Sequence, residues 1–210
     1  MDTGQLNIAV GKHTQGARRM LLRDKRFWFF LPALLTPPFV VTGLFIHQGF
    51  VIEAKGWTLE WFAECFIVYG VVHWVASLLA GWLVDRFSAS ALLALYTLPV
   101  AAAMVVLATV SGMDSALWVL SLIALSIGFA GPIGGALWAE VYGPERIASI
   151  RSLVFSLVIW STSASPILLG WCIDQHLSLQ AIAWWTATLS LFFAAATRFS
   201  YKMAASQDRR

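Results

Sequence analysis

The sequence predicts an all-α membrane protein with six transmembrane helices, and two observations lead to that prediction. Only 12% of the 210 residues are Asp, Glu, Lys or Arg, about half the usual share in a soluble domain. These few charges are clustered, so they leave six long stretches with no charged residue. Each stretch approaches or exceeds the roughly 20 apolar residues that a helix needs to cross a bilayer. A transmembrane barrel is excluded, since its strands would be about ten residues long and alternate in polarity.

The six expected helices follow one another along the chain with short connections, none of which is long enough to hold a separate domain. A basic segment, residues 1–26, precedes the six-helix bundle of residues 27–200, and a polar tail, residues 201–210, follows it. The helices are expected at Phe27–Ile52, Cys65–Val84, Phe87–Met113, Ser115–Ala139, Ser152–Ile173 and Gln175–Thr197.

The distribution of basic residues predicts the orientation in the membrane. Of the 14 Lys and Arg residues, all except Lys55 fall in the segments that six helices would place on one side. Cytoplasmic loops carry the excess of Lys and Arg, so both termini are expected in the cytoplasm of a multi-pass protein of the inner (plasma) membrane. The net charge of +3 is thereby explained by topology, and the expected partner is the lipid bilayer rather than nucleic acid.

A short repeat predicts the internal organisation of the bundle. Gly81-Trp82-Leu83-Val84-Asp85 ends the second expected helix, and Gly170-Trp171-Cys172-Ile173-Asp174 ends the fifth, 89 residues later. Adding the same offset to the residue numbers of the first and third helices gives ranges close to those of the fourth and sixth. Because three is odd, the second copy would cross the membrane in the opposite direction. The pattern predicts a three-plus-three inverted repeat, which is a transporter design.

Three stretches resemble a known family of membrane transporters. Gly81, Leu83, Asp85 and Arg86 match the loop motif Gly-x-Leu-x-Asp-Arg-x-Gly-Arg-Arg of the major facilitator superfamily (MFS), although Ser88-Ala89-Ser90 depart from its second part. Bacterial members are also similar to the following stretches of this chain: Thr42–Gln48 with Lys55-Gly56-Trp57, and Ala139–Gly143 with Arg146 and Ile150-Arg151. The resemblance covers about residues 20–200. It implies an MFS half-bundle, helices 7 to 12 of a twelve-helix carrier, with the first half outside this chain.

The resemblance implies a function and a conformational latch. The function would be transmembrane transport of a small-molecule substrate by a secondary transporter that uses alternating access. In the family, charged loop residues latch one state of that cycle. Here we expect Gly81 to allow a close helix approach, Asp85 to accept hydrogen bonds at the start of another helix, and Arg86 to pair with Glu140. Arg151 of the other cytoplasmic loop belongs to the same expected latch.

Two further groups of residues are candidates for the transport path. The fourth helix is expected to pack tightly or flex at a hinge formed by Gly131, Pro132, Gly134 and Gly135. Pro37-Pro38 and Pro166 predict breaks in the first and fifth helices. Polar residues inside the helices are few, and those expected to line a substrate cavity are His47, Gln48 and His73.

An enzyme is not expected. The sequence has no Gly-x-Ser-x-Gly motif, no phosphate-binding glycine loop, no metal-ligand spacing and no paired carboxylates within the helices. No cofactor is therefore predicted. Cys65 and Cys172 both fall near the outer face, so a disulfide or two free thiols are possible.

The alternative function is a non-transporting six-span membrane module or an inactive truncated carrier. As a carrier, the chain would need a homodimer or a missing N-terminal six-helix half.

Overall fold

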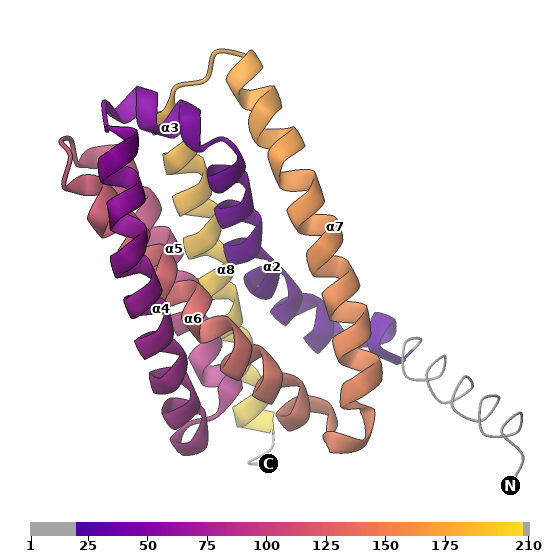
Figure 1. Cartoon of the computed structure of the whole chain (residues 1–210). Helices are drawn as coiled ribbons and strands as arrows, with labels where there is room; N and C mark the ends of the chain where they lie inside the picture. Colours follow the sequence, from indigo (N-terminus) through magenta and orange to yellow (C-terminus); the bar gives the residue numbers. More distant parts are fainter. Residues whose placement is uncertain (1–19, 208–210) are drawn as a thin grey trace, which may run out of the picture.

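The computed structural model describes residues 20–207, with side chains to residue 197, as an all-helical bundle (Figure 1). As predicted, six helices within these described residues are long and apolar enough to cross a membrane, which fits a multi-pass membrane protein. They are α2 (Lys25–Ile46), α4 (Leu59–Arg86), α5 (Ala89–Thr109), α6 (Ser115–Tyr142), α7 (Ile147–Asp174) and α8 (Leu179–Gln207). The short helix α3 (Gln48–Lys55) and the 3-10 turn η1 (Pro144–Arg146) connect them. The expected basic segment lies outside the described residues up to position 19, as does the end of the tail, 208–210.

The first predicted helix is split in two. Helix α2 ends at Ile46, His47 forms its C-cap, and α3 begins at Gln48. Figure 1 shows α3 lying across one end of the bundle. The 22 residues of α2 rise about 33 Å, already enough to span a bilayer, so the remaining apolar residues turn along its surface. The sequence prediction of one helix to Ile52 was therefore wrong.

Polar side chains just before α2, α4 and α5 fix the starts of these helices. The Asp24 carboxylate accepts a hydrogen bond from the Arg26 amide at 2.8 Å, and Thr58 and Ser88 make corresponding bonds to Trp61 and Ala91. Such N-caps satisfy amide groups that have no partner within the helix.

Helices α4 and α7 begin well before their predicted starts, and α8 continues well past its predicted end. Helix α4 starts at Leu59 rather than Cys65, and α7 at Ile147 rather than Ser152. At the other end of the chain, α8 continues to Gln207, into the stretch predicted as a polar tail.

Breaks were predicted at the prolines of the first and fifth helices, but the helices continue through these residues. Helix α2 continues through Pro32, Pro37 and Pro38, and α7 continues through Pro166. Proline removes the hydrogen bond to the carbonyl four residues earlier, so Pro38 leaves the Leu34 carbonyl without its helical partner. The buried Tyr96 hydroxyl of α5 donates to this carbonyl at 3.2 Å. A neighbouring helix thus replaces the lost bond, as is common in membrane helices.

Helix α5 lies at the centre of the bundle and α4 and α7 at its edges. Helix α5 packs against α6 and α8, while α4 packs mainly on α6 and α7 mainly on α2. In Figure 1, α4 and α7 stand on opposite sides of the other helices. Large apolar side chains on both remain exposed, including Trp74 and Trp160. In a bilayer these faces contact lipid or another protein rather than water.

Side chains of the α3–α4 connection hold the C-terminal end of α5. The Lys55 ammonium donates to the carbonyls of Leu107 and Val110, and the Trp57 indole donates to the Gly112 carbonyl and the Ser115 hydroxyl. Burial lowers the pKa of Lys55 from its usual range. A cation at this position satisfies the last carbonyls of α5 and complements the negative end of its dipole.

Candidate functional site: a groove between α2, α6 and α7

A groove of about 690 Å³ opens where α7 leans on α2 but has little contact with α6. Its walls are apolar, aromatic or small, apart from one charged residue, Arg151. The lining residues are Leu34, Pro38, Tyr96, Ile127, Ala130, Gly131, Gly134, Gly135, Trp138, Arg151, Ser152, Val154, Phe155 and Val158. A volume of this size lies within the usual range, roughly 300–1,000 Å³, of small-molecule sites.

Three of the four predicted hinge residues form the α6 wall of this groove. A Cβ atom placed on Gly131 would meet nothing within 4 Å, and one on Gly134 would meet only Leu34 Cδ1 at 3.7 Å. The glycines therefore leave open space beside the α6 backbone. Helix α6 is continuous through Pro132, and flexing at this point stays a prediction.

Arg151 reaches across the groove from α7 to α6. Its Nη2 atom lies 2.7 Å from the position of a Cβ on Gly135, so a side chain at that position would require the guanidinium to shift. No acidic residue lines the groove. The structure therefore places Arg151 against the α6 backbone rather than beside Glu140.

Glu140, near the C-terminus of α6, caps the N-terminus of α5. Its carboxylate accepts hydrogen bonds from the amides of Ala89 at 2.6 Å and Ser90 at 3.3 Å, and from the Ser90 hydroxyl at 3.5 Å. A carboxylate is favoured here because the first amides of a helix lack partners and the helix dipole is positive. The sequence assigned this role to Asp85. Ser88 and Ser90, typical of a helix start, were the signal that could have located the site.

Gly81, Asp85 and Arg86, the other residues of the predicted latch, lie near the end of α4. The Arg86 guanidinium lies over the Trp82 ring, 4.6 Å from its centroid, in a cation–π contact. Asp85 is exposed in the last turn of α4. A Cβ on Gly81 would meet nothing within 4 Å, so the expected close helix approach does not occur there. Among the described residues Arg86 and Glu140 form no ion pair, and the latch stays a prediction for another state.

None of the three predicted cavity residues lines the groove. The His47 Nδ1 atom is 3.2 Å from the Gly43 carbonyl oxygen, and its Nε2 atom faces Gly170 of α7. Gln48 borders a small apolar space at the α3 end of the bundle. His73 stacks on Tyr69 in α4, with ring centroids 6.1 Å apart and an interplanar angle of 11°. Its Nδ1 atom is buried without a hydrogen-bond partner among the described residues.

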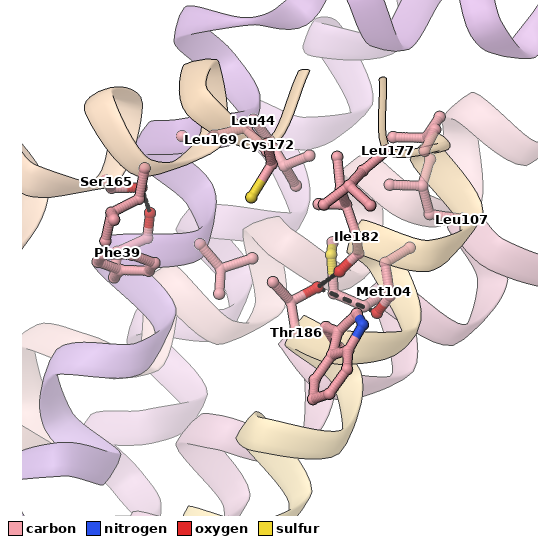
Figure 2. A pocket seen from close by; sticks show the side chains of 16 residues that line it. Phe39, Leu44, Met104, Leu107, Ser165, Leu169, Cys172, Leu177, Ile182 and Thr186 are labelled. Atoms are coloured by element: carbon pink, nitrogen blue, oxygen red, sulfur yellow. Dashed lines mark hydrogen bonds between the residues drawn. The ribbon is translucent and has the colours of Figure 1, made fainter. Parts of the chain in front are cut away.

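A second cavity, of about 150 Å³, lies between α2, α5, α7 and α8 and is almost wholly apolar (Figure 2). The polar side chains labelled there are already bonded: Ser165 donates to the Phe39 carbonyl, and Thr186 to backbone carbonyls of its own helix. Cys172 borders this cavity as a free thiol, and Cys65 is also free. The cavity offers no group to orient a polar ligand.

No cluster of His, Cys, Asp or Glu suited to a metal ion occurs within the part of the chain that the structure describes. Comparisons with known proteins return no match: no family model, no curated protein and no solved structure is similar to this chain.

Proposed function

We propose that the chain is one six-helix bundle of an MFS-type secondary transporter, which moves a small solute by alternating access, and that it is not an enzyme. The six apolar helices and the groove between three of them are compatible with this role. We further propose the cytoplasmic membrane as its location, with both termini in the cytoplasm. The other bundle of the carrier would be a second copy or a separate six-helix half.

The helix boundaries support an inverted repeat. Adding 89 to the first residues of α2, α4 and α5 gives 114, 148 and 178, and helices α6, α7 and α8 begin at 115, 147 and 179. Helix α7 ends at Asp174, the last residue of the Gly-Trp-x-Val/Ile-Asp repeat, and α4 ends at Arg86, one residue after the repeat. Three helices that recur at one spacing are the sequence order expected of a three-plus-three transporter bundle.

The observation that carries the proposal is a pair of equivalent helix crossings. Helix α4 crosses α6 where Gly128 meets Ala76, and a Cβ on Gly128 would lie 2.6 Å from the Ala76 Cβ. Helix α7 crosses α2 where the Ser165 hydroxyl donates to the Phe39 carbonyl. The repeat offset of 89 residues relates Phe39 to Gly128 and Ala76 to Ser165. The two contacts therefore join the same pair of repeat positions.

These equivalent crossings matter for transport because they join the two three-helix repeats, or triplets. The second helix of each triplet, α4 or α7, packs on the first helix of the other triplet, α6 or α2. The two triplets are interlocked, and each bundle is expected to move as a unit. Rocking of such bundles around a site between them is the usual mechanism of alternating access. The groove adjoins one of these crossings and lies beside α7, an edge helix.

The test is uptake by proteoliposomes that contain the purified chain, scored by mass spectrometry of a mixed pool of small solutes. The expected result is accumulation of at least one solute above protein-free liposomes. A matched variant, Gly131→Leu, fills the groove at a position with no neighbour within 4 Å and should abolish uptake.

The oligomeric state is measured in parallel by light scattering of the detergent-solubilised protein. A dimer would supply the two bundles that a carrier needs. A folded dimer that accumulates no solute under any ion gradient would contradict the proposal and favour the non-transporting six-span module.

A further inference from the structure

We propose that the groove between α2, α6 and α7 binds an amphipathic organic anion, with Arg151 contacting the anionic group and the α6 wall contacting the apolar body. Calling this ligand the transported solute rests on the proposed function, whereas binding itself does not.

The charge of the groove points to an anion. Arg151 is the only charged residue in its lining, and no Asp or Glu faces it. Among the described residues the guanidinium forms no ion pair or hydrogen bond, while the Glu140 carboxylate is already used by the amides of α5. Arg151 is exposed and lies near the start of α7, so its guanidinium is accessible to an anion that enters the groove. A carboxylate or phosphate fits the planar donor fork of arginine.

The shape of the groove leaves space for an apolar body beside that charge. Gly131 and Gly134 remove side chains from the α6 wall just before Gly135, where the guanidinium lies. Phe155 on α7 adds an aromatic ring that is 66% exposed, whereas Trp138 on α6 borders the groove with only 1% of its surface exposed. An exposed aromatic ring, a glycine-rich wall and a single cation together form a surface that is charged at one end and apolar along its length.

Two sources can supply this chemistry: a soluble carboxylate with an apolar body, or the phosphate of an anionic lipid. Both would place the anion on Arg151 and the hydrocarbon part along α6. They differ in how they reach the groove, one from water and the other from the bilayer, and the experiment separates them.

The experiment measures equilibrium binding of phenylacetate and of its uncharged analogue, phenylacetamide, to the full chain in nanodiscs of phosphatidylcholine. Phenylacetate should bind about tenfold or more tightly, the effect expected of a hydrogen bond to a charged group. Arg151→Gln should abolish this preference, and Arg151→Lys should keep part of it. Gly131→Leu should weaken binding of both probes because it fills the groove.

Arg146→Gln is the matched control. It removes the same charge from the same loop region, but Arg146 contacts Met20 and does not line the groove. Its preference for phenylacetate should equal that of the wild type. Equal binding of the two probes to the wild type, or a preference that survives in folded Arg151→Gln, would overturn the proposal. Thermal unfolding in the same nanodiscs checks that each variant is folded.

Adding phosphatidylglycerol to the nanodiscs identifies the source of the anion. Loss of phenylacetate binding in the wild type would identify the lipid phosphate as occupant of the Arg151 site, and unchanged binding would identify a soluble anion. Because binding is measured without flux, phenylacetate binding with no uptake of any solute would overturn the carrier alone. Uptake of uncharged solutes without the anion preference would overturn this site alone.

Discussion

The Ser165 hydroxyl of α7 donates a hydrogen bond to the backbone carbonyl of Phe39 in α2. The same Ser165 oxygen lies 2.6 Å from the position of a Cβ on Gly43, so a small residue is needed on each helix. This crossing is the main attachment of α7 to the bundle, because α7 packs chiefly on α2. Its repeat equivalent, between Ala76 and Gly128, has no hydroxyl and depends on close packing.

Loss of the Ser165 hydroxyl should weaken the attachment of α7. We expect Ser165→Ala to lower the free energy of unfolding by about 0.5–1.5 kcal/mol, the usual net contribution of one hydrogen bond. Chemical denaturation in detergent micelles measures it. Ser156→Ala is the control, because that exposed hydroxyl bonds only within α7. Equal stability of the two variants would show that the crossing does not depend on this bond.

The α4–α6 crossing should not tolerate a methyl group at Gly128. A Cβ there would lie 2.6 Å from the Ala76 Cβ and 2.7 Å from the His73 carbonyl oxygen. Because a backbone atom cannot easily move aside, Gly128→Ala should cost about 1–3 kcal/mol of unfolding free energy through overpacking.

Gly131→Ala provides the comparison on the same helix, since nothing lies within 4 Å of its added methyl. It should leave stability unchanged or raise it by up to about 1 kcal/mol, since alanine favours helix. Thermal unfolding of both variants in one detergent decides the matter, and a Gly128→Ala variant as stable as Gly131→Ala would refute the close crossing.

Removal of the Glu140 carboxylate should destabilise the start of α5. Glu140→Ala leaves the amides of Ala89 and Ser90 without their acceptor, so unfolding should become easier by about 0.5–2 kcal/mol, as for other lost caps. Hydrogen exchange at the Ala89 and Ser90 amides should accelerate. Glu145→Ala, in the exposed turn η1, should change neither quantity, and unaltered exchange in Glu140→Ala would argue against the cap.

The orientation in the membrane can be tested with single cysteines in a chain in which Cys65 and Cys172 are replaced by serine. Ser111→Cys marks the end of the bundle that carries Lys55, and Glu145→Cys marks the end with most other basic residues. A membrane-impermeant maleimide should label Ser111→Cys in intact cells and Glu145→Cys only after permeabilisation, because basic loops stay in the cytoplasm. The reverse pattern would overturn the predicted topology.

The sequence by itself determined the number of helices and their order. Charged residues are too costly within a bilayer to fall there by chance, so charge-free stretches locate the helices. The repeat of Gly81–Asp85 at Gly170–Asp174 likewise marked the ends of α4 and α7. The sequence did not reveal the turn at His47, which lies within a continuous apolar run. Apolar residues suit both a spanning helix and a helix along the membrane surface, so composition does not mark the turn.

Only the tertiary structure decided which faces meet and hence where the groove lies. In a membrane the lipid-facing and the packed faces of a helix are both apolar, so hydrophobic periodicity does not distinguish them. The sequence grouped Arg151 with Glu140, but folding sends one side chain to Gly135 on α6 and the other to the start of α5. Contacts between residues distant in the chain placed these two charges, and the groove formed because α7 packs on α2 and stands away from α6.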